Sequence, residues 1–509
     1  MRILVTGANG YIGSHLVPRL LSEGHQVTCV VREPKRFALA ELSLANLDIV
    51  QADFLDEVSL RTLPRQVDVA FYLVHSMGAV GDDFSALERK SAQNFAAFAQ
   101  TSHLQQIIYL SGIANDPNLS KHLQSRLQVE KILADSGVPL TVLRAAMIIG
   151  SGSASFQILS DLVEKLPFMV TPKWVHTRNQ PIALQDVLFY LQAAILHKPL
   201  MGRSFDIGGP EIVSYKDFML AYAKARGLRR LIVDVPFFSP RLSSYWLYFI
   251  TSTSFPLAKS LVDSMKNEVV KGDDVIDRLL PHNCLNLEQA LRRALRNKQR
   301  DTLHASWKDA AVSSNPGGLD PDTVAVPQQG VLRDRRTLPI ERPLKEVSDR
   351  IWSIGGAKGW YAMDWAWRVR GFVDKLAGGI GLRRGRRHPT DLRVGDAVDF
   401  WRVVEATPDR RRLVLFAEVK MPGKAWLSLE LEFKGRHAFL CQTATFQPKG
   451  ISGRAYWYAL KPLHSILFQR MARALTGYAS GERPGQQRYP KGPRAKSLHK
   501  SGLLAQQEA

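Results

Sequence analysis

The feature that most constrains the fold is a glycine-rich turn near the N-terminus. Residues 2–6 read RILVT, which is typical of a buried strand, and residues 6–16 continue as TGANGYIGSHL. Glycines at three-residue spacing allow a tight turn, a close approach of the backbone to a pyrophosphate and close packing of the next helix. The N-terminus of that helix presents free N–H groups to the phosphates. The motif therefore predicts a dinucleotide site, with contacts from Gly7, Asn9, Gly10, Tyr11, Ile12 and Gly13.

Apolar runs of strand length alternate with amphipathic runs of helix length over the first 150 residues. Strands are predicted at 2–6, 26–31, 47–51, 67–74, 106–111 and 140–144, and helices at 12–23, 83–101 and 119–136. Such βαβ alternation predicts an α/β fold with a doubly wound parallel sheet of the Rossmann type. Residues 180–295 are expected to form a smaller mixed lobe, with helices at 215–226 and 286–298.

The residues that follow the second strand indicate which dinucleotide binds. Arg32 lies where the adenosine ribose is expected, and Arg36 adds a second cation. Arginine there accommodates a 2′-phosphate, whereas an acidic residue would bind the 2′-hydroxyl of NAD. Glu33 argues in the opposite direction, so NADP is expected and NAD remains an alternative. Further cofactor contacts are expected after the third and fourth strands, from Asp53, Phe54 and Leu73.

The pattern changes near residue 299, which predicts a second domain. Residues 299–328 are rich in Ser, Pro, Gly and Asp and are expected to form a linker. Residues 329–478 then suggest an α+β domain, and residues 479–509 a basic disordered tail. Strands of this domain are predicted at 395–406, 411–420, 424–434 and 436–447, and helices at 343–354, 360–377 and 460–476.

Charge and cysteine content limit the partners and the compartment. Of the net charge of +21, residues 1–300 contribute 33 Lys and Arg against 27 Asp and Glu, and residues 301–509 contribute 35 against 20. A basic half can indicate an anionic membrane surface, an anionic ligand or only a solvated surface; nucleic acid is disfavoured because no known binding signature occurs. Cys29, Cys284 and Cys441 are far apart and suggest neither disulfides nor a metal site, which favours a cytoplasmic protein.

Several ordered motifs resemble the atypical short-chain dehydrogenase/reductase superfamily, in its NmrA-like branch of YbjT-type proteins. Besides the glycine turn, the likeness rests on LVHSMG (73–78), IIYLSGI (107–113), LRAAMIIGSGSASF (143–156), TPKWVHTRNQPIALQDV (171–187) and FDIGGPEIVSY (205–215). The resemblance covers roughly residues 1–295 and implies an NAD(P)-binding domain over residues 1–298.

The resemblance also implies catalytic positions, two of which have changed residues. Ser111 matches the family serine, whereas the family Tyr-x-x-x-Lys falls on His122 and Arg126 in SKHLQSR (120–126). Histidine can partly replace a proton donor near neutral pH, and Arg126 keeps a cation for the ribose or a phosphate. An active enzyme could instead use His75 or Tyr109. Alternatively, His122 and Arg126 are ordinary residues on a helix surface.

The C-terminal part resembles the START/SRPBCC helix-grip superfamily. The likeness rests on residues 413–433, residues 441–464 and the helix SILFQRMARAL (465–475). It implies an apolar cavity between a curved sheet and a long helix, and therefore an apolar small-molecule ligand. An aromatic stripe in this domain is expected to form core or cavity wall, namely Trp360, Trp365, Trp367 and Phe372. The loop GGIGLRRGRRHP (378–389) could hold a phosphate or lipid headgroup, or be an exposed turn.

Two functions therefore compete. One is an oxidoreductase that acts on an apolar carbonyl or quinone-like compound. The other is a non-catalytic dinucleotide sensor or scaffold, which the missing tyrosine favours. A third alternative is a peripheral membrane component, suggested by the basic C-terminal half and by the apolar segment at 245–258.

Overall fold

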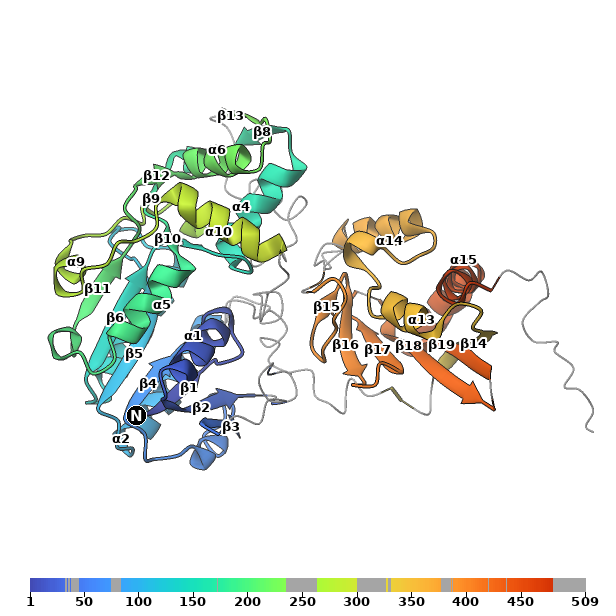
Figure 1. The fold of residues 1–509 in the computed structure, drawn as a ribbon, viewed down its shortest axis with the longest axis horizontal. Coiled ribbons are helices and arrows are strands. Elements are labelled where there is room, and N and C mark those ends of the chain that lie inside the picture. The colour runs from blue at the N-terminus through green and yellow to red at the C-terminus, as the bar shows by residue number, and fades with distance from the viewer. Residues whose placement is uncertain are drawn as a thin grey trace, which may run out of the picture.

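The described part of the computed structural model contains two large sheets, one in each half of the chain, and three two-stranded sheets (Figure 1). It describes residues 1–32, 45–74, 84–171, 173–234, 263–299, 331–376, 388–419, 421–435 and 437–478, and the single residues 34, 37, 326, 327 and 386. The expected tail at 479–509, the apolar segment at 245–258 and nearly all of the expected linker at 299–328 lie outside the described residues.

The N-terminal half contains a seven-stranded parallel sheet. Its strands are β1 (Arg2–Thr6), β2 (Gln26–Val31), β3 (Leu47–Gln51), β4 (Val69–Tyr72), β5 (Gln106–Gly112), β6 (Leu140–Ala145) and β11 (Ser204–Ile207). The order across the sheet is β11-β6-β5-β4-β1-β2-β3, and every neighbouring pair is parallel. Strands β2 and β3 are added on one side of β1, and β4 and the later strands are added on its other side. Ligands of such folds bind at the point between β1 and β4 where this order reverses. The predicted Rossmann-type sheet is thus confirmed.

Helices cover both faces of this sheet because its strands are apolar on both sides. Ile3 and Val5 pack into a core with α1 (Tyr11–Ser22) and α5 (Leu184–Ala193), which Figure 1 shows on one face. Leu4 and Tyr72 point the opposite way, into a core with α2 (Phe84–Gln100) and α3 (Lys121–Ala134). This alternation follows from the two-residue period of a strand.

A smaller lobe follows β6, but it does not coincide with the expected residues 180–295, because α5 and β11 lie in that range and pack with the parallel sheet. It contains α4 (Ala154–Lys165), α6 (Tyr215–Ala225) and α10 (Leu287–Gln299), whereas α9 (Val275–Leu279) lies against β11, with Ile276 in the core of the parallel sheet. Short strands pair within it: β7 (Ile148–Ile149) with β10 (Ile182–Ala183), β8 (Phe168–Thr171) with β13 (Leu231–Asp234), and β9 (Arg178–Asn179) with β12 (Val213–Ser214). Phe156, Leu159, Phe218 and Tyr222 form the centre of its core.

The C-terminal half contains a six-stranded sheet whose neighbouring strands are all antiparallel. The strands are β14 (Leu332–Pro339), β15 (Ala397–Val398), β16 (Trp401–Ala406), β17 (Arg412–Ala417), β18 (Gly423–Lys434) and β19 (His437–Pro448), in the order β14-β19-β18-β17-β16-β15. Its helices are α13 (Leu344–Ile351), α14 (Asp364–Leu376) and α15 (Gly450–Thr476). Because α15 contacts both β14 and β19, the last helix lies against the first and last strands.

Both faces of β18 bury apolar side chains. Leu427, Leu429 and Leu431 are buried on one face, and Trp426 on the other face is only 1% exposed. Its ring packs 5.5 Å from that of Phe416 on β17, so the second face also buries aromatic surface. Phe433, on the same face as the leucines, is 47% exposed because β18 ends at the next residue.

The aromatic stripe is divided between two environments. Trp360 precedes α14 and is buried with Trp367, whereas Trp365 and Phe372 are 62% and 56% exposed. The expectation of core or cavity wall is therefore wrong for Trp365 and Phe372, which lie on the opposite side of the helix. α15 also begins ten residues earlier than predicted and includes Pro462. Among the helices that the structure describes, none is long and apolar enough to cross a membrane.

Candidate nucleotide-binding and catalytic site

Gly7 connects the end of β1 to the end of β4. The Thr6 hydroxyl donates to Phe71 O (3.1 Å) and accepts from Leu73 N (3.0 Å), which fixes the two strand ends against each other. Gly7 has φ +64°, and a Cβ on it would lie 2.6 Å from Leu73 O. Only glycine fits this turn, because another residue would be strained in φ and would collide with backbone.

The start of α1 is equally restricted. A Cβ on Gly13 would lie 2.5 Å from Gly7 O and 2.7 Å from Ala8 Cα, so this helix can approach the turn only through a glycine. Gly10 is the N-cap and therefore offers no capping side chain, and the first turn carries no acidic residue. The first N–H groups of α1 can thus serve an external anion such as a pyrophosphate. These features fit the dinucleotide site that the sequence predicts.

The side chain of Tyr11 packs away from this turn. A Cβ on Gly150 would collide with the Tyr11 hydroxyl, so this glycine makes room for the ring. The hydroxyl is buried and has no hydrogen-bond partner among the described residues, and burial raises the pKa of Tyr11. Asn9 and Ile12, the other two predicted contacts of this turn, are half-buried.

The expected adenosine end of the site is described in part. Arg32 is exposed directly after β2, whereas Glu33 and Arg36 lie outside the described residues. Asp53, after β3, is half-buried, and its carboxylate accepts from Leu55 N (2.9 Å). The ring of Phe54 is only 6% exposed and packs against Tyr72 and Phe95. Phe54 therefore shapes this edge mainly through its backbone.

Two hydroxyl groups lie on the same face near the end of β5. Ser111 is 4% exposed and Tyr109 is fully buried, two residues earlier on the strand. Neither hydroxyl forms a hydrogen bond with the described residues. Ser111 is nevertheless close enough to Tyr109 to have a small lowering effect on the pKa of Tyr109. Burial dominates and raises the pKa of Tyr109 to about 12, against the influence of Arg126. Tyr109 therefore keeps its proton at neutral pH.

Arg126 lies on α3, one helical turn after His122, and is bound into the fold. Its Nη2 donates to Leu110 O (2.8 Å), and its guanidinium lies 5.1 Å from the centre of the Tyr109 ring. Burial alone would lower the pKa of Arg126, but Tyr109 and the buried Glu88 of α2 offset this and raise it. Arg126 thus fixes the strand at the residue before Ser111.

His122 lies half-buried in the first turn of α3, whose N-cap is Ser120. This turn is close to the end of β5, because a Cβ on Gly112 would lie 3.2 Å from Leu123 Cδ2. Asn267 accepts from Ser120 N (3.1 Å) and holds a later segment over the same turn. His75, the other expected substitute for the family tyrosine, lies outside the described residues.

A buried carboxylate that no sequence motif indicates, Glu88, also takes part in this site. Glu88 of α2 is 3% exposed and accepts a hydrogen bond of 2.5 Å from Ser125 Oγ, next to Arg126. It belongs to no motif, and its isolated position in a helix gives no signal of burial. A further group of side chains that could bind a metal is also found, formed by Asp186, His282 and Cys284.

Comparisons with known proteins agree with this geometry. Residues 7–166 match a family described as NAD(P)H-binding, and residues 327–471 match a family described as a protein of unknown function, DUF2867. Divinyl chlorophyllide a 8-vinyl-reductase of Cucumis sativus is 25% identical over 224 residues, which are 41% of this chain and 52% of that protein. NADH dehydrogenase [ubiquinone] 1 alpha subcomplex subunit 9 of Arabidopsis thaliana is 24% identical over 216 residues, 41% and 54% of the two chains.

The chain thus spans about half the length of these two relatives. Among solved structures, an NADPH-dependent quinone oxidoreductase from Escherichia coli in complex with NADPH is 19% identical, with a TM-score of 0.48. That similarity covers 58% of this chain and 99% of the other. The match over residues 7–166, the glycine motif and the parallel sheet together indicate that the N-terminal part is an NAD(P)-binding domain with a Rossmann-type fold.

Proposed function

We propose that the protein is an NADP(H)-dependent oxidoreductase that reduces an apolar carbonyl or quinone-like compound. The observation that carries the proposal is the turn at Gly7 and Gly13. No Cβ fits at either glycine, and the N-terminus of α1 has no capping side chain. Ser111 lies buried at the end of β5, in the sheet that this turn adjoins. NADPH, when bound, supplies the hydride. Arg32 would bind the 2′-phosphate that distinguishes it from NADH.

Ser111, His122 and Arg126 take different parts in the proposed reaction. The Ser111 hydroxyl, which has no good partner among the described residues, donates to the substrate oxygen. His122 supplies the proton, since imidazole exchanges protons near neutral pH. Arg126 is a positioning residue, because it holds the Leu110 carbonyl beside Ser111. Tyr109 is less suitable as a donor because its ring is fully buried.

Turnover of NADPH with a panel of quinones and aromatic aldehydes tests this assignment. Loss of a positioned proton donor typically costs about 10²–10⁴ in rate, so His122→Ala should lower kcat in this range. Ser111→Ala should also lower kcat, while both variants keep their affinity for NADPH. Ser136→Ala is a matched control, because Ser136 is also buried but its hydroxyl bonds Leu133 O at the end of α3. Unchanged turnover in both variants would refute the catalytic roles.

A second candidate function is a dinucleotide sensor or scaffold without catalysis. Arg126 stands at the family lysine position, yet its guanidinium binds a strand carbonyl and covers the Tyr109 ring. A cation held in this way contributes to the fold even if no reaction occurs. Tight NADPH binding without turnover of any substrate in the panel would favour this second function.

We propose further that residues 329–478 form a helix-grip domain of the START/SRPBCC type that collects the apolar compound. The arrangement of α15 against β14 and β19 supports this, as does an aromatic cluster that includes Trp367 and Trp401. The indole N–H groups of these two residues are buried without a partner among the described residues, so they could donate to a polar atom of the ligand. Quenching of tryptophan fluorescence by a quinone, weakened in Trp367→Phe, would support it; no quenching would oppose it.

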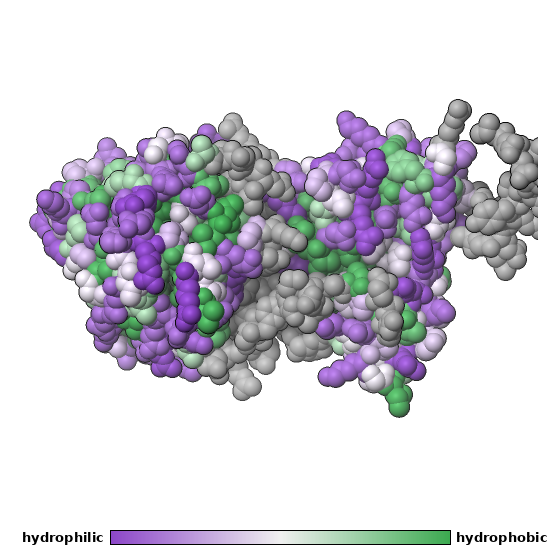
Figure 2. All heavy atoms as spheres, turned by 90° about the horizontal axis from the view of Figure 1, so that it is seen from below, coloured by the Kyte–Doolittle hydropathy of each residue, from purple (hydrophilic) through white to green (hydrophobic). Residues whose placement is uncertain are grey.

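We also propose that the protein acts in the cytoplasm and that an anionic membrane surface is a further partner. Exposed apolar side chains follow one side of α14, namely Trp365, Val369, Phe372 and Val373. Figure 2 shows apolar patches among hydrophilic residues on both halves of one face. Salt-sensitive sedimentation with anionic vesicles, reduced by Trp365→Glu, would support this partner. Equal sedimentation with neutral vesicles, or none, would refute it.

A further inference from the structure

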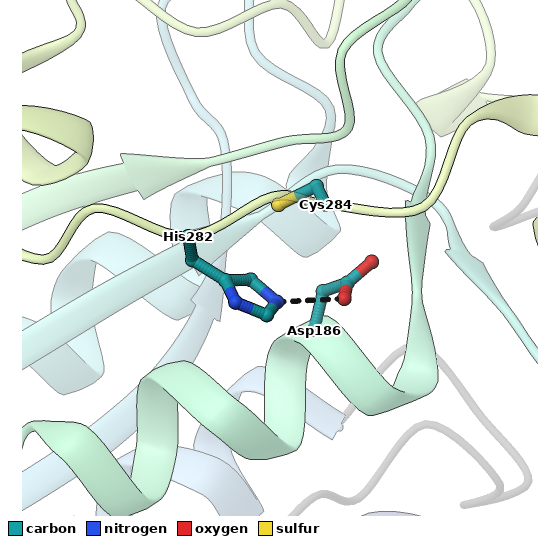
Figure 3. Close-up of side chains that lie close together, drawn as sticks. All are labelled: Asp186, His282 and Cys284. Atoms are coloured by element: carbon teal, nitrogen blue, oxygen red, sulfur yellow. Dashed lines mark hydrogen bonds and ion pairs between the residues drawn. The ribbon is translucent and has the colours of Figure 1, made fainter.

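Three side chains of different chemistry meet at the start of α5. Asp186 lies in the first turn of this helix, and His282 and Cys284 come from the segment between α9 and α10 (Figure 3). Asp186 and His282 are 96 positions apart in the chain. One ligand atom of each residue, a carboxylate oxygen, an imidazole nitrogen and a sulfur, lies within 4.8 Å of the other two. This is a set of donors that zinc accepts.

Neighbouring residues already hold the three side chains in place. Asp186 Oδ1 lies 2.9 Å from His282 Nε2, and its Oδ2 accepts from Leu285 N (3.0 Å). The ring of Phe189 stacks on that of His282 with 3.9 Å between centroids and 15° between planes. The Tyr190 hydroxyl lies 3.7 Å from Cys284 Sγ. Partners of this kind orient metal ligands and raise metal affinity.

The charges around the three side chains also favour a cation. Asp186 has a side chain that is only 4% exposed, and its ion-pair partner His282 is charged only when protonated. Asp277, which accepts from Tyr190 OH (3.1 Å), adds a second carboxylate nearby, although Lys271 pairs with it. The carboxylates of Asp186 and Asp277 thus bring negative charge to this group of side chains. A bound metal would compensate that charge.

We propose that Asp186, His282 and Cys284 bind one divalent transition-metal ion, with Zn²⁺ as the best match, and that water fills a fourth position. Zinc bonds of about 2.0–2.3 Å place tetrahedral ligands roughly 3.3–3.8 Å apart. The distances here are close enough for the three side chains to reach this arrangement by small rotations. Cys284 loses its thiol proton to solvent when its sulfur binds, and no other bond changes.

A metal site can be distinguished from a hydrogen bond that only holds two segments together. Without metal, the Asp186–His282 contact would only attach the segment at 282–285 to α5. Cys284 would then have no part in it, and zinc would not change the stability of the protein. A metal site requires the sulfur and makes stability depend on zinc.

The experiment uses the full chain, freed of metal by a chelator and then titrated with Zn²⁺ against a chromophoric competitor. We expect one equivalent of zinc to bind, and Cys284→Ser and His282→Ala to weaken binding at least 100-fold. Asp186→Asn, which keeps the size and shape of the side chain, should weaken it 10- to 100-fold. Cys441→Ser and His437→Ala remove the same residue types elsewhere and should leave zinc binding unchanged.

Substitution by Co²⁺ gives a second readout. A cobalt–thiolate charge-transfer band is expected in the wild-type protein and lost in Cys284→Ser. NADPH binding by each variant shows that the N-terminal domain is still folded, so loss of zinc affinity cannot be mistaken for unfolding. Zinc binding that persists in both Cys284→Ser and Asp186→Asn, or the absence of any stoichiometric binding to the wild-type chain, would overturn the proposal.

Discussion

Replacing Gly7 by alanine should weaken NADPH binding by a predictable amount. The new Cβ would lie 2.6 Å from Leu73 O, whereas ordinary contact begins at 3.4 Å, so the turn must retreat by about 0.8 Å. A displacement of this size breaks a backbone N–H bond to a phosphate oxygen. Because hydrogen bonds to charged groups contribute about 1.5–3 kcal/mol, the affinity should fall roughly 10- to 150-fold.

Gly24→Ala is the matched control for this substitution. Gly24 has φ +79°, similar to the +64° of Gly7, but a Cβ on it would meet nothing within 4 Å. Both variants therefore carry the strain of an alanine at positive φ, about 1–3 kcal/mol in stability. Only Gly7→Ala should also lose NADPH affinity, measured by calorimetric titration at a temperature where both are folded. Equal NADPH affinity in the two variants would refute the role of the turn.

Three further outcomes are expected. Arg32→Glu should weaken NADPH binding roughly 10-fold or more relative to NADH, whereas Arg292→Glu on the exposed face of α10 should not. Ser111→Ala should lower kcat with little change in the affinity for NADPH. Burial, and next Arg370, lower the pKa of His464 to about 4. His464 is therefore neutral when folded but titrates near 6.5 when unfolded, so its contribution to stability is lost by roughly 1.4 kcal/mol per unit as pH falls from about 6.5 to 4. Denaturation of His464→Gln should lack this slope, which exposed His437→Gln should retain.

The sequence predicted the parallel sheet well because most of its strands are apolar runs of strand length. β1, β2 and β3 occupy the residues expected, and α1 begins one residue earlier than expected. In such a sheet both faces are buried, so the strand signal does not depend on pairing. The glycine turn could also be predicted from the sequence, because the spacing of its glycines depends on local backbone geometry and not on contacts between distant segments.

The C-terminal half was less readable because helical periodicity does not say which side faces the core. Trp365 and Trp367 are two residues apart on α14, yet one is exposed and the other is buried beside Phe400. That outcome depends on where the sheet lies. The early start of α15 was missed for a related reason, since Ile451 is 88% exposed and gives no core-facing signal there.

The side chains of the candidate site were predicted only in part. Ser111 and Arg126 were found through motif positions, but the contact of Arg126 with Leu110 O depends on how α3 packs on β5. The group formed by Asp186, His282 and Cys284 could not be recognised from spacing, because 96 positions separate the first two residues. Contacts between distant segments become visible only in the folded chain.

The decisive measurement is a titration of the full chain with NADPH, NADH and their oxidised forms. We expect one nucleotide site per chain, with NADPH bound at least about 10-fold more tightly than NADH, and NADPH oxidation on addition of a quinone or aromatic aldehyde. No binding of any of these nucleotides would contradict the claim that residues 7–166 form a functional dinucleotide site.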